Sequence, residues 1–184
     1  MLKRFFFLGL VMVLLAPCVA MAQEAPRYTY VEVGFIDFDP DSGVSDDGGY
    51  AEGSLNVFKN FHLLAAYEAV GDYTFWNAGG GWHGLLGEEA DVFAEILWTD
   101  VDFDSTGGSI GDDGYEVSGG VRWNVLKRLE LKGAVNYVDL DSGGDDTSFE
   151  AEAMFSFGRL GVGANLEFGD SDTLRVFGRF TFGK

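Results

Sequence analysis

Residues 129–137 read LELKGAVNY, and residues 149–157 read FEAEAMFSF. In both stretches the odd-numbered positions hold apolar residues or glycine, whereas most even-numbered positions are polar, among them Glu130, Lys132 and Glu150. Successive side chains of an extended strand point to opposite faces, so the alternation predicts strands with one apolar and one polar face. Together the two stretches indicate an all-β fold.

The same alternation recurs wherever the chain is divided at its clusters of Gly and Asp. Most segments are close to the ~9–11 residues that a tilted strand needs to cross a bilayer, and sustained helical spacing is absent from the sequence. We therefore expect a closed, antiparallel, up-and-down transmembrane β-barrel of about ten strands, with eight strands as the alternative. The expected strands are residues 28–38, 49–57, 61–70, 75–83, 90–103, 114–123, 129–139, 147–157, 160–168 and 174–182.

Two kinds of connection alternate between these segments. One set is mostly tight, whereas the other contains longer stretches rich in Gly and Asp. Outer-membrane barrels have short turns on the periplasmic side and longer loops outside, so an even number of strands places both termini in the periplasm. The tight set is residues 58–60, 84–89, 124–128 and 158–159, and the other set is residues 39–48, 71–74, 104–113, 140–146 and 169–173.

The first residues predict export. Lys3 and Arg4 precede an apolar run that is too short to span a bilayer, and Ala20-Met21-Ala22 has the small-x-small pattern of a signal peptidase site. We expect residues 1–22 to be a cleaved signal peptide and residues 23–184 to form a single barrel domain. A lipoprotein signal ending at Cys18 is the alternative.

The composition excludes several classes of protein. The formal net charge is −18, which opposes binding to nucleic acid phosphates. The single cysteine, Cys18, lies in the predicted signal peptide, so the mature barrel has neither a disulfide nor a thiol nucleophile. Hydrophobic residues make up 47% of the chain and 17 residues are Phe, a composition that argues against disorder.

Aromatic residues on the apolar faces gather near the two ends of the expected strands. Two such girdles are typical of the two membrane interfaces, which favours an apolar outer surface. The alternative is a soluble barrel with these rings inside, where they would crowd a small lumen. The expected girdles are Phe35, Tyr67, Trp76, Trp98, Tyr115, Tyr137 and Phe168 at the loop ends, and Phe61, Trp82, Trp123, Phe157 and Phe182 at the turn ends.

The polar faces carry the charges that would line the lumen. Because buried charges need partners, we expect a lumen of salt bridges and trapped water without a wide pore. A narrow cation-preferring channel lined by acids is the alternative. The expected charge network is Glu32, Glu52, Glu68, Glu95, Glu116, Arg122, Lys132, Glu150, Glu152, Glu167, Arg175 and Arg179.

Aspartates repeat where strands enter the acidic loops. Asp is favoured in turns, so we expect these residues to be solvated, turn-forming side chains and the protein to have no cofactor. The alternative is a weak divalent-cation site, because clustered carboxylates at an outer surface could bind Ca²⁺ or Mg²⁺ shared with lipopolysaccharide phosphates. The residues concerned are Asp37, Asp39, Asp41, Asp102, Asp104, Asp139 and Asp141.

Catalysis has little support in the sequence. His62 and His83 are its two histidines, and both fall on polar faces near the turn ends. In this register neither meets a Ser–His–acid or Asp–His set at matching depth, so we expect two buried structural histidines and no enzyme. An outer-membrane hydrolase is the remaining alternative.

The plan of the chain resembles the small outer-membrane barrels of the OmpA-transmembrane and OmpX type, built with more strands. More narrowly, residues 28–35 (YTYVEVGF), 60–63 (NFHL) and 114–117 (GYEV) resemble the diffusible-signal-factor-regulated outer-membrane barrel family. The resemblance implies a monomeric barrel in the outer membrane of a Gram-negative bacterium, with membrane lipid, lipopolysaccharide and the barrel assembly machinery as partners. Gly183 and Lys184 follow the last aromatic residue, whereas such barrels usually end on an aromatic residue that this machinery reads.

Overall fold

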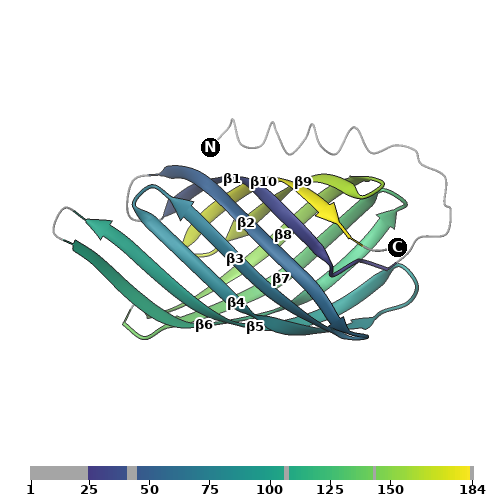
Figure 1. Cartoon of the computed structure of the whole chain (residues 1–184), viewed down its shortest axis with the longest axis horizontal. Helices are drawn as coiled ribbons and strands as arrows, with labels where there is room; N and C mark the ends of the chain where they lie inside the picture. Colours follow the sequence, from purple (N-terminus) through teal and green to yellow (C-terminus); the bar gives the residue numbers. More distant parts are fainter. Residues whose placement is uncertain (1–24, 41–44, 106–107, 143, 183–184) are drawn as a thin grey trace.

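The described residues of the computed structural model, 25–40, 45–105, 108–142 and 144–182, form one closed β-barrel (Figure 1). Each strand pairs antiparallel with its neighbour in sequence, and the first strand closes the barrel against the last, with Tyr30 opposite Thr181. Residues 1–22, the predicted signal peptide, lie outside the described residues. The domain boundaries therefore stay a prediction.

Ten strands make up the described barrel, so the prediction of ten strands is confirmed and the alternative of eight is wrong. In the part of the chain that the structure describes, no helix has the length and apolar character to cross a membrane. The strands are β1 (Tyr30–Pro40), β2 (Asp46–Phe58), β3 (Phe61–Val70), β4 (Tyr73–Leu85), β5 (Ala90–Ser105), β6 (Gly108–Leu126), β7 (Leu129–Leu140), β8 (Gly144–Phe157), β9 (Leu160–Phe168) and β10 (Ser171–Thr181).

We call the end that holds the β2–β3, β4–β5, β6–β7 and β8–β9 connections the turn end, and the opposite end the loop end. The start of β1 and the end of β10 lie at the turn end. Figure 1 shows the hairpin of β5 and β6 projecting beyond the other strands at the loop end.

The long loops expected at the loop end are largely wrong. Residues 104–105 and 108–113 continue the ladder of β5 and β6, which are 16 and 19 residues long, and Asp100 pairs with Asp113. Likewise β1 extends to Pro40, β2 begins at Asp46, and β8 begins at Gly144. Gly and Asp favour turns, but pairing with a neighbouring strand satisfies their backbone groups equally well and lengthens the hairpins.

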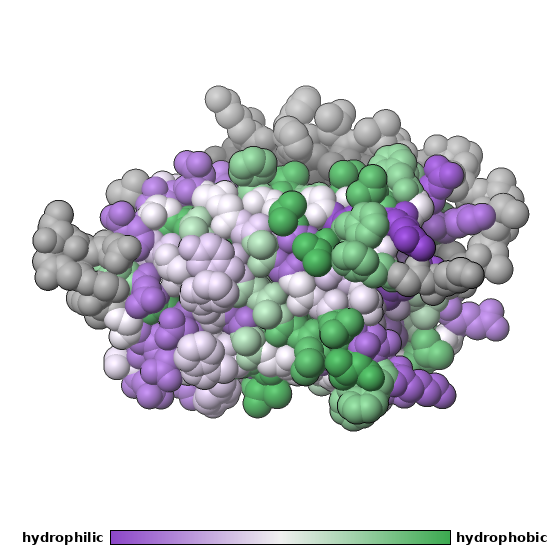
Figure 2. All heavy atoms as spheres, in the orientation of Figure 1, coloured by the Kyte–Doolittle hydropathy of each residue, from purple (hydrophilic) through white to green (hydrophobic). Residues whose placement is uncertain are grey.

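The outer surface is apolar at mid-height. Figure 2 shows hydrophobic and weakly polar residues over the middle of the barrel, with hydrophilic residues gathered toward both ends. Eleven of the twelve expected girdle residues are exposed on this surface, and Tyr137 is half-buried. Exposed apolar area on this scale is unusual for a soluble monomer and typical of a lipid-facing surface.

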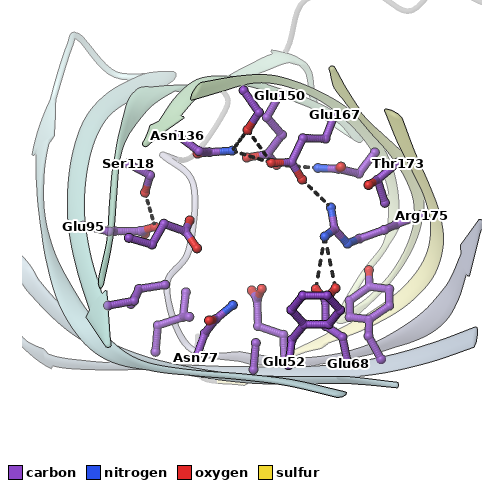
Figure 3. Close-up of a pocket in the computed structure, with 18 of the residues that line it drawn as sticks. Glu52, Glu68, Asn77, Glu95, Ser118, Asn136, Glu150, Glu167, Thr173 and Arg175 are labelled. Carbon is purple, nitrogen blue, oxygen red and sulfur yellow. Dashed lines mark hydrogen bonds and ion pairs between the residues drawn. The ribbon is translucent and has the colours of Figure 1, made fainter. Parts of the chain in front are cut away.

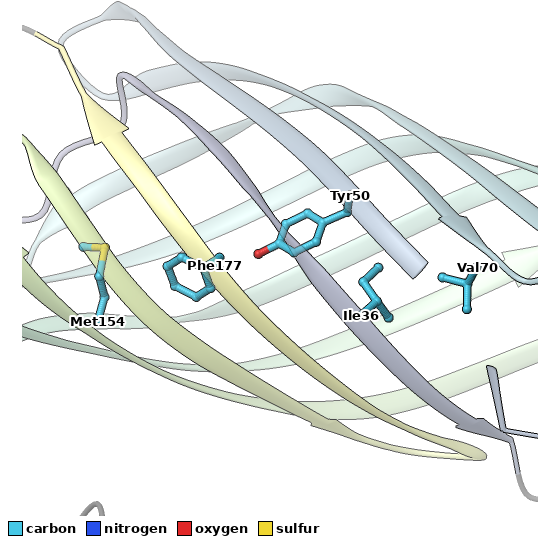
Figure 4. Close-up of a cluster of buried hydrophobic side chains, with 5 residues drawn as sticks. All are labelled: Ile36, Tyr50, Val70, Met154 and Phe177. Atoms are coloured by element: carbon cyan, nitrogen blue, oxygen red, sulfur yellow. The ribbon is translucent and has the colours of Figure 1, made fainter. Parts of the chain in front are cut away.

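An apolar cluster fills part of the interior. Ile36, Tyr50, Val70, Met154 and Phe177 are all buried, and they lie along the wall formed by β8, β10, β1, β2 and β3 (Figure 4). Gly34 makes room for it, since a Cβ atom there would lie 2.6 Å from Cε1 of Tyr50. The cluster narrows the lumen on this side of the barrel.

Candidate functional site: the lumen

The lumen contains a cavity of about 430 Å³. Every member of the charge network expected from the sequence lines it. The alternation of polar and apolar positions explains this placement, because a closed barrel directs one face of each strand inward. The twelve residues are Glu32, Glu52, Glu68, Glu95, Glu116, Arg122, Lys132, Glu150, Glu152, Glu167, Arg175 and Arg179.

Two arginines connect the charges at the turn end. Arg179 on β10 binds Glu32 on β1 at 2.5 Å and Glu152 on β8 at 3.1 Å, and it lies 3.6 Å from Glu130 on β7. Arg122 on β6 also binds Glu130, at 2.5 Å. All five side chains are buried. Charges removed from water to this extent are tolerated because each meets an opposite charge and further hydrogen bonds.

The segment before β1 enters the barrel at this end. The ring of Tyr28 stacks on His83 with 3.9 Å between ring centroids, and the guanidinium of Arg122 lies over the same ring at 4.6 Å. The hydroxyl of Tyr28 donates to Asp91, and its backbone oxygen accepts a hydrogen bond from Ser54. Tyr28 thus connects the N-terminal segment to β2, β4, β5 and β6.

A second aromatic residue, Tyr30, packs against both arginines. The ring of Tyr30 lies 4.4 Å from the Arg179 guanidinium and 5.9 Å from that of Arg122, and its hydroxyl donates to Glu52 at 2.5 Å. Tyr50 donates to Glu32 in the same way. Tyrosine hydroxyls therefore donate hydrogen bonds to Glu52 and Glu32, in addition to the contacts that the arginines make with the carboxylates of this region.

His62 is buried and hydrogen-bonded, as expected from the sequence, and its partner is an acid. Its Nε2 lies 2.8 Å from Glu95 Oε1, and Ser118 donates to the other oxygen of Glu95 at 3.1 Å. The sequence did not indicate this partner because His62 and Glu95 lie on β3 and β5, two strands apart. The serine hydroxyl contacts the acid rather than the imidazole, and His62 is only 1% exposed. This is not the order of contacts in a catalytic triad, where the base contacts the nucleophile.

We call Tyr28, His62, His83, Asp91, Arg122, Glu130 and Arg179 the turn-end layer. Each of these side chains is buried. The cavity reaches Tyr28, Arg122 and Arg179, whereas His62, His83, Asp91 and Glu130 do not line it. The layer therefore forms the floor of the cavity.

Charges in the loop-end half form a looser ring. Arg175 on β10 binds Glu167 at 2.9 Å on the neighbouring β9, and it also reaches Glu68 at 3.2 Å on β3. Lys132 binds Glu150 at 2.9 Å. Figure 3 shows an open centre between these side chains, with Arg175 and Glu167 on one side and Glu95 on the other. We call this part of the lumen the loop-end cavity.

Several polar atoms of the loop-end cavity have no partner among the described residues. They are Oδ1 of Asn77, Oγ1 of Thr99, Oδ1 of Asn165 and Nε of Arg175. The carboxylate of Glu116 likewise makes no hydrogen bond or ion pair within the described part of the chain. Buried polar groups in folded proteins are almost always satisfied, so the loop-end cavity is unusual in this respect.

The aspartates of the alternative divalent-cation site lie on separate parts of the loop end. Asp37 and Asp39 belong to β1, Asp102 to β5 and Asp139 to β7, while Asp141 follows β7. Tyr115 donates to Asp139, and Ser45 donates to Asp39. The described residues contain no group of three or more potential metal ligands. Asp41 and the side chain of Asp104 lie outside the described residues, so the cation site stays a prediction.

The expected network omitted several residues that the structure brings into the turn-end layer. Glu130 and Asp91 are buried there, as is Tyr28. Alternation along the chain could have placed Tyr28 on the inward face, because Tyr28, Tyr30 and Glu32 fall on one face of an extended segment. The sequence gives no indication that the first of them crosses the barrel to reach β4.

Comparison with known proteins gives the class of fold. No family model matches the chain, and no curated protein sequence does. A structure of the NanC porin is similar with a TM-score of 0.55 and 7% sequence identity, over 83% of this chain and 100% of that one. The KdgM porin is similar with a TM-score of 0.51 and 10% identity, over 83% of this chain and 99% of that one.

A second structure, the KdgM porin in complex with disordered oligogalacturonate, gives a TM-score of 0.52 and 9% identity over 84% of this chain and 100% of that one. Identities this low establish the fold alone. The chain has the porin-like β-barrel fold of outer-membrane proteins.

Proposed function

We propose that the protein is a non-enzymatic, integral outer-membrane barrel of a Gram-negative bacterium, with a structural or surface-interaction role and a lumen closed at its turn end. The observation that carries this proposal is the turn-end layer, which consists of buried, mutually paired side chains. In this orientation both termini lie in the periplasm, and the loop-end cavity opens toward the outside of the cell.

The outer surface supports insertion into a membrane. The apolar band and the two groups of exposed aromatic rings match what bilayer interfaces select in transmembrane barrels. Acidic hairpins, such as the one formed by β5 and β6, then extend from the membrane toward lipopolysaccharide, where Ca²⁺ or Mg²⁺ held by the aspartates is a further proposal. We propose the monomer as the functional unit, assembled by the barrel assembly machinery.

Closure at the turn end argues against free diffusion of solutes. A solute that passed through would have to displace Tyr28, which Arg122 and His83 hold from two sides. Separating Arg122 from Glu130 would leave buried charges unpaired, which costs several kcal/mol. The layer is therefore expected to remain shut unless it is actively opened.

A narrow cation-preferring channel is the second candidate, because carboxylates outnumber cations along the lumen. Oligogalacturonate, named with the KdgM porin, is a poor candidate ligand here, since its sugar acids would meet this excess of carboxylates. An outer-membrane hydrolase has less support, because Ser118 contacts Glu95 rather than His62. Membership of the diffusible-signal-factor-regulated family remains a proposal that rests on the sequence resemblance.

Planar-bilayer recording tests the closed lumen. We expect no steady conductance from the wild-type barrel, and small steady steps from Tyr28→Ala, which removes a ring from the floor of the cavity. Phe61→Ala is the control, because it removes an exposed ring at the same end of the barrel. Cation-selective steps from the wild-type protein would overturn closure and support the channel.

A further inference from the structure

We propose that the loop-end cavity binds a small organic cation through a primary ammonium group held by Asn77, Thr99 and Glu116. The proposal deepens the proposed function, on which it rests, since it names what a cavity closed at the turn end would hold. It depends on three observations: unpaired acceptor atoms on one wall, an excess of negative charge around Glu116, and a cavity of suitable size.

The first observation is that three neighbouring strands bring oxygen acceptors to one wall. Asn77 on β4 is directly opposite Thr99 on β5. Thr99 is opposite Gly114 on β6, and Glu116 lies two residues further along that strand on the same face. Diagonal neighbours of this kind are within reach of a long side chain. Gly114 itself adds no side chain beside Thr99.

Two of these acceptor atoms are buried without partners. Thr99 is 5% exposed, and its Oγ1 makes no hydrogen bond within the described residues. Oδ1 of Asn77 is in the same condition, and the half-buried Glu116 makes no hydrogen bond or ion pair in that part of the chain. A buried acceptor without a donor is costly, so a ligand that donated hydrogen bonds to these atoms would bind favourably.

The second observation is the charge around Glu116. The carboxylates of Glu167, Glu150 and Glu95 all repel it, and Lys132, the cation that attracts it, is already bound to Glu150 at 2.9 Å. Negative charge held out of bulk water needs an opposite charge nearby. A bound cation would supply one, whereas an anion would meet further repulsion.

The shape of the site favours an ammonium over a metal ion. A primary ammonium carries three N–H donors, which match one acceptor each from Asn77, Thr99 and Glu116. Ca²⁺ requires six to eight oxygens and usually several carboxylates, and the described residues contain no cluster of three potential ligands. The geometry therefore points to a monovalent donor group.

The third observation is the space available for the rest of the molecule. The cavity of about 430 Å³ is within the range that holds small organic ligands. Figure 3 shows the open centre between Asn77 and Glu95 on one side and Arg175 on the other. Nε of Arg175 and Oδ1 of Asn165, which belong to residues lining the cavity, are unpaired in the described structure.

Isothermal titration calorimetry on the full-length protein, folded in detergent micelles at low salt, tests the site with ethanolamine as the probe. Choline has the same charge and hydroxyl but no N–H donors, and ethylene glycol has no charge. We expect binding of ethanolamine, binding of choline that is weaker by about tenfold, and no binding of ethylene glycol. Equal binding of ethanolamine and choline, or no binding of ethanolamine, would overturn the proposal.

Variants locate the binding. Glu116→Gln keeps the shape of the side chain and should weaken ethanolamine binding by about tenfold or more, whereas Thr99→Val should weaken it by about threefold. Glu88→Gln is the control, because it removes the same charge from an exposed residue of the β4–β5 connection. Heat-modifiable migration on a gel verifies that each variant is folded, and unchanged binding by folded Glu116→Gln would overturn the site.

The result separates the site from the proposed function. Ethanolamine binding that Glu116→Gln removes supports the site even if the wild-type barrel conducts ions, in which case only the closed lumen is wrong. A non-conducting barrel that binds no ethanolamine keeps the closed lumen and overturns the site.

Discussion

The two halves of the lumen differ in how they handle charge. At the turn end, Arg122 and Arg179 are enclosed by carboxylates and by the rings of Tyr28 and Tyr30, and all of these side chains are buried. At the loop end, the ion pairs of Arg175 border an open cavity whose opposite wall leaves Thr99 without a hydrogen-bond partner among the described residues.

This difference indicates that the charges at the two ends of the lumen have different roles. In the proposed function, the buried and fully paired charges close the lumen, and they stabilise the fold because removing one of them leaves its partner buried without an opposite charge. A set that is partly paired and open to solvent contributes less to stability and remains available to a ligand. The two arginines of β10 allow a direct test, since three residues separate them on the same strand.

The largest effect is expected from Arg179→Met. The substitution leaves Glu32 and Glu152 buried without their cation, so the free energy of unfolding should fall by about 3–5 kcal/mol. Urea unfolding of the barrel in detergent micelles measures the loss. Arg128→Met, at an exposed position in the β6–β7 connection, should change little. A loss as small as that of the control would show that the turn-end layer does not hold the barrel together.

A smaller effect is expected from Arg175→Met. The side chain of Arg175 is 19% exposed and its partners Glu68 and Glu167 are comparably accessible, against 5% for Arg179. Water can therefore solvate the carboxylates that the arginine leaves, and the loss should be about 1–2 kcal/mol. The same urea titration applies, and equal losses for the two arginines would contradict the distinction between the two halves.

The inward and outward faces could be predicted because they depend on local order alone. Alternation with a period of two assigns Glu150 and Glu152 to the lumen and Phe149 to the outside, whatever the neighbouring strands are. Strand ends were predicted less well at the loop end, where Gly and Asp continue the β5–β6 ladder instead of forming a loop. Turn propensity describes one residue at a time, whereas a ladder also depends on its partner.

The pairing inside the lumen could not be predicted from the sequence. Arg175 and Glu68 are 107 residues apart and lie on strands that are not neighbours, so their contact depends on the diameter and shear of the closed barrel. The same holds for His62 and Glu95, which meet across β4. The number of strands could be predicted from the sequence, but the stagger between neighbouring strands could not. This stagger decides which inward-facing residues lie at the same height in the barrel.

The smallest effect, and one of opposite sign, is expected from Thr99→Val. In the ligand-free barrel the substitution replaces an unpaired buried hydroxyl with a methyl group of similar size, so the free energy of unfolding should rise by up to about 1 kcal/mol. Thr147→Val, at an exposed position of β8, is the matched control and should have little effect. Urea unfolding without ligand measures both.

A loss of stability in Thr99→Val would mean that the hydroxyl is satisfied, by water for example, and would remove one of the three acceptors from the loop-end wall. A gain in stability that accompanies weaker ethanolamine binding would instead show that the barrel keeps this hydroxyl at the expense of its own stability. Natural proteins retain such groups where a ligand completes them. The opposite response of Arg179→Met would then separate the half of the lumen that closes the barrel from the half that binds.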